Sequence, residues 1–279
     1  MLAPLLDGLT FTEGPRWHEG RLWFSDFYTG RVLAVTPEGT VETIVEVPPR
    51  PSGLGWLPDG SLLVVSMLDR RLLRVRDGRA GLHADLGAIA TGPCNDMVVD
   101  ARGRAYVGNF GFDRHRGEPP RAAMLARVDP DGTVSAAAED LEFPNGSVIT
   151  PDGRTLVVAE TLGHRLTAFD VAADGGLSRR RVWAALGDVF PDGICLDAEG
   201  AIWVTDARGP DLLRVRESGG IDRRVPVGAG RHAFACMLGG ADRRTLCVCT
   251  CTGSGPAVAD KRDGRIESLR VDVAGAGLP

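Results

Sequence analysis

The sequence has almost no lysine and no block of positive charge. Lys261 is the only lysine among 32 basic residues, and the formal net charge is -5. A surface that binds nucleic acid needs clustered positive charge to replace the counterions of the phosphates. We therefore expect a small-molecule partner and no nucleic-acid partner.

Long apolar runs are also missing. No segment approaches the roughly 18 consecutive apolar residues that a membrane-spanning helix needs. The leucines near the N-terminus follow no basic segment and are accompanied by Asp7, which is not the pattern of a secretory signal. These absences predict a cytoplasmic protein with no membrane partner, and they leave its oligomeric state open.

The six cysteines do not have the spacing of a disulfide framework. Cys94, Cys195 and Cys236 stand apart, and the other three alternate at positions 247, 249 and 251. Alternation puts three side chains on one face of a strand. We expect small, buried, reduced side chains, and a site for a soft metal is the disfavoured alternative.

Common catalytic motifs are absent as well. The chain has no Gly-x-Ser-x-Gly elbow, no His-Glu-x-x-His pair and no phosphate-binding loop. Helical periodicity is nearly absent, and only residues 179–186 favour a short helical turn. Glycine and proline, with 37 and 18 residues, are plentiful and regularly spaced.

What the chain contains is a repeat of about 40 to 50 residues. Each copy is an apolar run, a tight turn, a second apolar run and then two further short runs, as in Ser52-Gly-Leu-Gly-Trp-Leu-Pro-Asp-Gly-Ser-Leu-Leu-Val-Val-Ser. Four short strands per copy are typical of a propeller blade. The prediction is an all-β, six-bladed β-propeller with four-stranded blades around a central channel, forming one domain over residues 1–279. Residues 265–273 are expected to form a strand that helps to close the ring. The alternative, a β-sandwich or two barrels, does not explain the repetition.

The first residues of the six copies should form a ring at one mouth of the channel. They are Glu13, Ser52, Asn95, Asn145, Asp192 and Phe234. Glu13, Asn145 and Asp192 offer two carboxylates and an amide oxygen, which suit Ca²⁺, Mg²⁺ or Mn²⁺, whereas Zn²⁺ more often recruits His or Cys. The alternative is that these residues only begin turns and strands.

Other candidates lie near this mouth. His232 is close to the sixth copy and is the histidine best placed to line the channel. Phe234, Phe110 and Phe112 would make the mouth apolar. The longest insertion, residues 112–123, is either a solvated loop or a lid over the channel.

Together these residues resemble the senescence marker protein (regucalcin)/gluconolactonase family. The resemblance rests on Phe11-Thr-Glu13-Gly-Pro-Arg-Trp, Asn95-Asp, Phe143-Pro-Asn145-Gly, Phe190-Pro-Asp192-Gly-Ile and the ending Val271-Asp-Val-Ala-Gly-Ala-Gly-Leu-Pro. It implies one catalytic divalent metal ion held by Glu13, Asn145 and Asp192. Ca²⁺ is the first choice, with Zn²⁺, Mn²⁺ and Mg²⁺ as alternatives. Asp192 would also act as general base, and Asn95 would contact the substrate.

One position departs from this family pattern. Sugar lactonases of the animal type carry an arginine two residues before the asparagine that matches Asn95, and this chain has Pro93 there. The departure predicts a lactone less polar than an aldonolactone, which Phe234, His232 and Phe112 would help to bind.

The leading hypothesis is therefore metal-dependent hydrolysis of a lactone or a related small cyclic ester. The metal would polarise the carbonyl, and Asp192 would take a proton from the attacking water. Two alternatives stay open. One is a strictosidine-synthase-like or other pathway enzyme on the same fold, and the other is a propeller that binds calcium or a ligand without catalysis.

Overall fold

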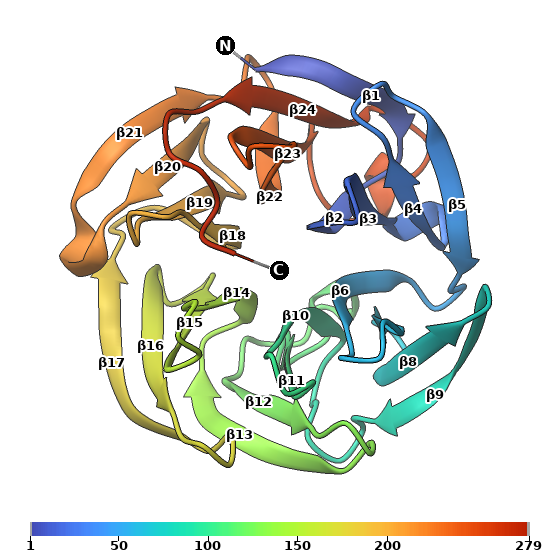
Figure 1. The fold of residues 1–279 in the computed structure, drawn as a ribbon, viewed down its shortest axis with the longest axis vertical. Helices are drawn as coiled ribbons and strands as arrows, with labels where there is room; N and C mark the ends of the chain where they lie inside the picture. The colour runs from blue at the N-terminus through green and yellow to red at the C-terminus, as the bar shows by residue number, and fades with distance from the viewer. Residues whose placement is uncertain (1, 278–279) are drawn as a thin grey trace.

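A computed structural model describes residues 2–277. Its strands form six four-stranded antiparallel sheets that surround a central axis (Figure 1). Each sheet contacts the next through its innermost strand, and the sixth contacts the first. This closed ring confirms the predicted six-bladed β-propeller.

The strands fall into four concentric sets. The inner strands are β2 (Thr12–His18), β6 (Pro51–Trp56), β10 (Cys94–Val99), β14 (Pro144–Ile149), β18 (Pro191–Leu196) and β22 (His232–Gly239). The second strands are β3 (Arg21–Asp26), β7 (Leu62–Ser66), β11 (Ala105–Asn109), β15 (Thr155–Glu160), β19 (Ile202–Asp206) and β23 (Thr245–Cys251). The third strands are β4 (Arg31–Val35), β8 (Arg71–Arg76), β12 (Ala123–Val128), β16 (Arg165–Val171), β20 (Asp211–Val215) and β24 (Gly264–Arg270). The outer strands are β5 (Val41–Glu46), β9 (Arg79–Asp85), β13 (Val134–Leu141), β17 (Leu177–Ala185), β21 (Ile221–Pro226) and β1 (Ala3–Leu9).

In the part of the chain that the structure describes, four short 3₁₀ helices lie in the connections between strands. They are η1 (Phe27–Thr29), η2 (Arg114–Arg116), η3 (Glu217–Gly219) and η4 (Pro256–Val258). None of the helices in the described part of the chain has the length and apolar character required to cross a membrane.

The two ends of the chain close the ring together. The N-terminal strand β1 pairs antiparallel with β24, so it supplies the outer strand of the sixth blade. The expected C-terminal strand is therefore present as β24, and its partner comes from the other end of the chain. This joint ties the first and last segments into one sheet, as Figure 1 shows near the N-terminus.

The short helical turn expected at residues 179–186 is wrong. This segment belongs to β17, which pairs with β16 along its length. Arg180 donates hydrogen bonds to the backbone oxygens of Glu139 and Asp140, and Trp183 is buried while its neighbour Val182 is 58% exposed. Residues 178–182 of this outer strand are all exposed and residues 183 and 184 are both buried, so the segment has no period-two pattern that would have indicated a strand.

The core lies between neighbouring blades. Trp203 and Tyr106 are among the largest fully buried side chains. All six cysteines are buried and free, as expected. Cys195 and Cys236 are not isolated, however, because their sulfur atoms lie 3.6 Å apart between adjacent inner strands.

Every inner strand has an irregularity in its pairing close to its first residues. A β-bulge at this place re-aims the side chains beside it. The glycines that follow Asn145 and Asp192 are required by packing: a Cβ on Gly146 would lie 2.6 Å from the backbone nitrogen of Ile194, and one on Gly193 would lie 2.5 Å from the Cα of Ala235. These Asn-Gly and Asp-Gly pairs therefore sit within strands, where adjacent inner strands touch.

The segment after β24 leads to the opposite mouth of the channel. After β24 the backbone crosses the sixth and fifth blades, where Gly275 donates to the carbonyl of Arg243 at 2.9 Å and Ala276 donates to that of Leu196 at 3.0 Å. Figure 1 shows this segment running toward the central axis. We call this end the tail mouth, and the end where Glu13, Asn145 and Asp192 lie the carboxylate mouth. Leu278 and Pro279, the last residues of the family-like ending, lie outside the described residues.

Candidate active site at the carboxylate mouth

Three blades bring Glu13, Asn145 and Asp192 to one end of the channel. Each is the second residue of its inner strand, in β2, β14 and β18. The three side chains are only 5 to 7% exposed. Buried polar groups of this kind need partners, because losing water without a replacement is costly.

The two carboxylates act on each other electrostatically. Burial raises the pKa of Asp192 to about 8. Burial also raises the pKa of Glu13 well above its ordinary value, and the negative charges of Asp192 and Asp96 raise it further. Two buried acids that repel each other form an arrangement that a cation would stabilise.

Asn145 lies beside this pair. Hydrogen bonding from its side chain lowers the pKa of Asp192, against the effect of burial. Its Nδ2 also donates to Thr161 Oγ1 at 3.1 Å, and that hydroxyl donates to the carbonyl of Pro191 at 2.7 Å. The first of these hydrogen bonds uses the amide nitrogen of Asn145, and neither uses its amide oxygen.

The donor set fits a hard divalent cation. Two carboxylates and an amide oxygen are the ligands that Ca²⁺, Mg²⁺ and Mn²⁺ favour. No three side chains from His, Cys, Asp and Glu converge as a metal-binding group within residues 2–277. The third protein donor of the candidate set is an amide, which such a group does not include.

Asn95 and its neighbour Asp96 lie on β10 in the same ring, and both are 5% exposed. Asn95 Nδ2 donates to the carbonyl of Pro144 at 3.3 Å, which leaves its second hydrogen available. Asp96 Oδ1 accepts from Arg16 Nη2 at 2.8 Å, and the same guanidinium reaches the carbonyl of Met97. This buried ion pair was not predicted, although both residues lie inside the motifs that matched the family.

An aromatic cluster covers this end of the channel. It consists of Phe11, Phe27, Phe110, Phe112, Phe143 and Phe234. The rings of Phe11 and Phe234 lie 4.7 Å apart, and those of Phe110 and Phe143 lie 4.3 Å apart. Phe234 and Phe112, which the sequence suggested as substrate-binding residues, are both buried in this cluster.

His232 is half-buried beside the cluster. Its ring lies 6.4 Å from that of Phe234, and its Nδ1 is 3.1 Å from the carbonyl of Gly209. The hydrogen bond fixes the ring, so this histidine acts here as a link between the fifth and sixth blades.

The insertion at residues 112–123 reaches across the mouth. Arg114, in η2 of the third blade, donates to Ser254 Oγ of the sixth blade at 3.2 Å. Its positive charge is the strongest influence opposing the effect of burial on the pKa of Asp192. Arg114 is a functional candidate that the sequence analysis missed, because an arginine in a polar loop has no distinguishing signal.

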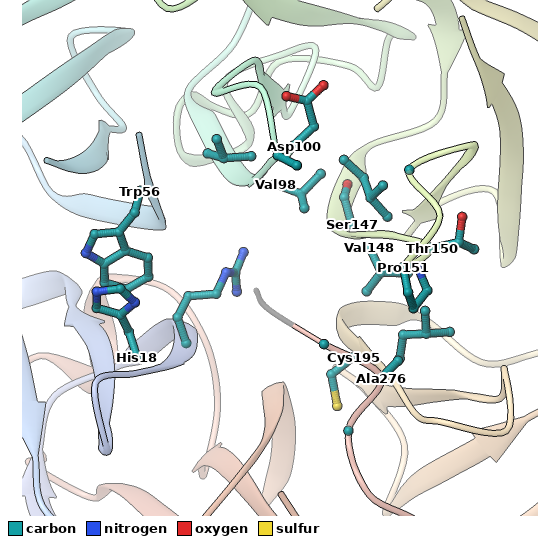
Figure 2. A pocket seen from close by; sticks show the side chains of 18 of the residues that line it. His18, Trp56, Val98, Asp100, Ser147, Val148, Thr150, Pro151, Cys195 and Ala276 are labelled. Atoms are coloured by element: carbon teal, nitrogen blue, oxygen red, sulfur yellow. The ribbon is translucent and has the colours of Figure 1, made fainter. Parts of the chain in front are cut away.

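A cavity of about 660 Å³ lies at the other end of the channel. It is lined by the last residues of the inner strands and by Gly275, Ala276 and Gly277 of the tail. Figure 2 shows His18 stacked on Trp56 at one side, with Val98, Val148 and Cys195 also facing the space. Size alone would make this a ligand pocket, but Glu13, Asn145 and Asp192 do not line it. The reactive groups gather at the carboxylate mouth, and we place the candidate site there.

The fold and the oxygen donors at one mouth are those of a class of propeller enzymes. Comparison with known proteins identifies the family within that class. Residues 11–252 match the model of the SMP-30/gluconolactonase/LRE-like region, and the chain belongs to this family. A pentonolactonase from Haloferax volcanii is 30% identical over 96% of this chain and 92% of its own length. A regucalcin from Danio rerio is 29% identical over 55% of this chain and 52% of its own length.

Solved structures agree with the fold. A gluconolactonase from Xanthomonas campestris superimposes with a TM-score of 0.76 at 27% identity, over 96% of this chain and 89% of the other. A calcium-binding regucalcin from Agrobacterium tumefaciens has a TM-score of 0.83 at 24% identity, over 100% of this chain and 96% of the other. At that lower identity the second likeness concerns the fold alone.

Proposed function

We propose that this protein is a lactonase, a hydrolase that opens the ester bond of a small lactone with the help of one divalent cation. The observation that carries the proposal is the pair of buried carboxylates, Glu13 and Asp192, joined by Asn145 at one mouth of the channel. Membership of the SMP-30/gluconolactonase family and the pentonolactonase and gluconolactonase relatives support the reaction class.

Glu13, Asn145 and Asp192 would hold the cation, with Ca²⁺ as the first choice because all three donors are hard oxygens. When bound, a divalent cation polarises the lactone carbonyl, stabilises the oxyanion that forms and keeps both carboxylates ionised.

The side chains of this protein supply the remaining chemistry. Asp192 accepts a proton from the water that attacks the carbonyl carbon. Asn95 donates its second amide hydrogen to the substrate. The aromatic cluster contacts the carbon skeleton of the substrate and excludes bulk water, which strengthens the electrostatic interactions in the site.

The test is metal analysis of the purified protein followed by turnover of a lactone panel with and without chelator. The panel includes aldonolactones and less polar lactones, because Pro93 stands where animal-type sugar lactonases have an arginine. We expect turnover that is lost with chelator and restored by added cation. Saturable Ca²⁺ binding without turnover of any lactone or ester would instead identify a non-catalytic binder, and turnover that survives chelation would refute metal dependence.

A further inference from the structure

Arg114 comes from a loop of the third blade, yet its contacts lie on the other side of the ring. The third and sixth blades are opposite each other in a six-bladed propeller, because the inner strands contact in the order β2, β6, β10, β14, β18 and β22. The hydrogen bond of 3.2 Å from Arg114 to Ser254 therefore crosses the carboxylate mouth. The guanidinium lies over the channel that a substrate must enter.

The surroundings of Arg114 place it near the reacting groups. Burial raises the pKa of Tyr28, in η1 of the first blade, and the positive charges of Arg50 and Arg114 both oppose that rise. Arg50 lies 4.8 Å from the centre of the Tyr28 ring. Arg114 thus acts on side chains of the first, fifth and sixth blades at once.

Several carboxylates are buried at the mouth that Arg114 crosses. Glu13, Asp96 and Asp192 are buried there, and Arg16 forms an ion pair with Asp96 at 2.8 Å. Asp206 accepts a hydrogen bond from the backbone nitrogen of Arg208, and the guanidinium of Arg208 lies 4.1 Å from the centre of the Phe190 ring. None of these contacts uses the guanidinium of Arg114.

The side-chain partner described for Arg114 is an uncharged hydroxyl. An arginine held by one neutral hydrogen bond gains more from a carboxylate, which accepts two charge-assisted hydrogen bonds from the planar guanidinium. A substrate carboxylate therefore displaces Ser254 at little cost.

We infer that Arg114 is a specificity-determining residue that selects lactones carrying a carboxylate, and this inference rests on the proposed function. Arg114 receives the substrate carboxylate at the mouth while the ester faces Glu13, Asn145 and Asp192. Through this contact the loop at 112–123 binds the substrate in place of the arginine that animal-type sugar lactonases carry at the position of Pro93.

The experiment compares γ-butyrolactone with the same ring bearing a carboxylate, 5-oxotetrahydrofuran-2-carboxylate. We expect Arg114→Gln to lower kcat/KM for the carboxylated lactone by about 10- to 100-fold, the loss of a hydrogen bond to a charged group, and to leave the neutral lactone nearly unchanged. Arg114→Lys should retain part of the preference. The control is Arg116→Gln. Arg116 is an exposed arginine of the same 3₁₀ helix, and its Nε lies 3.4 Å from Asp113. This variant should leave kcat/KM unchanged for both substrates.

Added salt should lower kcat/KM of the unmodified protein for the carboxylated lactone and should have little effect on Arg114→Gln. An equal effect of Arg114→Gln on both lactones, or no effect on either, would overturn the inference. Tetrahydrofuran-2-carboxylate, which has the ring and the charge but no ester, separates this failure from failure of the proposed function. If neither lactone is hydrolysed, the proposed function fails. Titration calorimetry of metal-loaded protein with tetrahydrofuran-2-carboxylate then tests the inference by itself. Weaker binding of this probe by Arg114→Gln supports the inference, and equal binding overturns it.

Discussion

The two mouths of the channel are built from the two ends of the same six strands, and they differ in chemistry. At the carboxylate mouth Glu13 and Asp192 are buried, and within residues 2–277 neither makes a described ion pair, although Arg16 and Arg114 lower their pKa values from a distance. At the tail mouth the charges are paired or exposed: Arg104 Nε lies 2.6 Å from Asp100, and Asp152 is exposed to solvent. The channel lining there is apolar, with Val98, Val148 and Leu196 among its residues.

The difference shows how one inner strand can contribute polar side chains to one mouth and apolar side chains to the other. The irregular pairing near the start of each inner strand turns polar side chains toward the axis. Beyond it, regular pairing resumes, and alternate apolar residues face the neighbouring blades. The mouth where chemistry is proposed therefore holds several buried acids, whereas valine and leucine side chains line much of the other mouth.

The largest contrast is expected in turnover. Asp192→Asn should lower kcat by about 10³-fold, because it removes the general base and one metal donor while keeping the side-chain shape. The matched change at the tail mouth is Asp152→Asn, which should leave kcat within about twofold of the unmodified protein. Removing a side chain lowers kcat only if that side chain stabilises the transition state, and Asp152 lines the cavity at the opposite mouth. Steady-state kinetics with the best lactone of the panel measures both. Comparable losses in the two variants would remove the distinction between the mouths.

The next contrast concerns stability without metal. Because the pKa of Asp192 is raised to about 8 in the folded chain, the folded state holds its proton more tightly than the unfolded state does. The penalty for ionising it is absent below its ordinary pKa and grows as the pH rises toward about 8. Asp192→Asn should therefore raise the melting temperature of chelator-treated protein at pH 8, by at least about 3 °C, and much less at pH 5.

Thermal unfolding in chelator at the two pH values checks this prediction. Asp100→Asn is not a suitable control because it breaks the ion pair with Arg104, so Asp152→Asn serves again. If the melting temperature of Asp192→Asn at pH 8 falls below that of the unmodified protein, ionised Asp192 does not destabilise the folded protein as predicted.

A smaller effect is expected from the close approach of the inner strands. Gly193→Ala should destabilise the fold by about 1–3 kcal/mol, because the new methyl group overlaps Ala235 of the next blade. Gly81→Ala is the control: Gly81 lies in the outer strand β9 and has nothing within 4 Å of its Cβ position. Denaturant unfolding compares them, and equal stabilities would show that the strands can separate without cost.

The smallest effect is expected at the tail mouth. His18→Ala removes a ring stacked on Trp56 at 4.0 Å between centroids, and should cost about 0.5–1.5 kcal/mol of stability. Turnover should stay within about twofold of the unmodified protein. A loss of turnover as large as that of Asp192→Asn would mean that the two mouths are coupled.

Local pattern alone predicted much of the fold. The strand–turn–strand repeat predicted six four-stranded blades, and the first residues of the copies predicted which side chains would share one mouth. Both succeed because a repeated unit puts equivalent residues at equivalent places in a closed ring. The helical turn at 179–186 failed because its arginines face solvent from an outer strand, where local propensity is overridden by pairing with β16.

The sequence by itself determined the blade, its number of copies and which residue begins the inner strand region of each copy, because these depend on alternation and spacing within about 50 residues. Only the tertiary structure decided that β1 closes the sixth blade, that Arg16 pairs with Asp96, and that Arg114 crosses the mouth to Ser254. Those contacts join residues 80 to about 260 positions apart. They exist only once the ring has closed, since nothing in a local stretch of sequence specifies which distant segment it will meet.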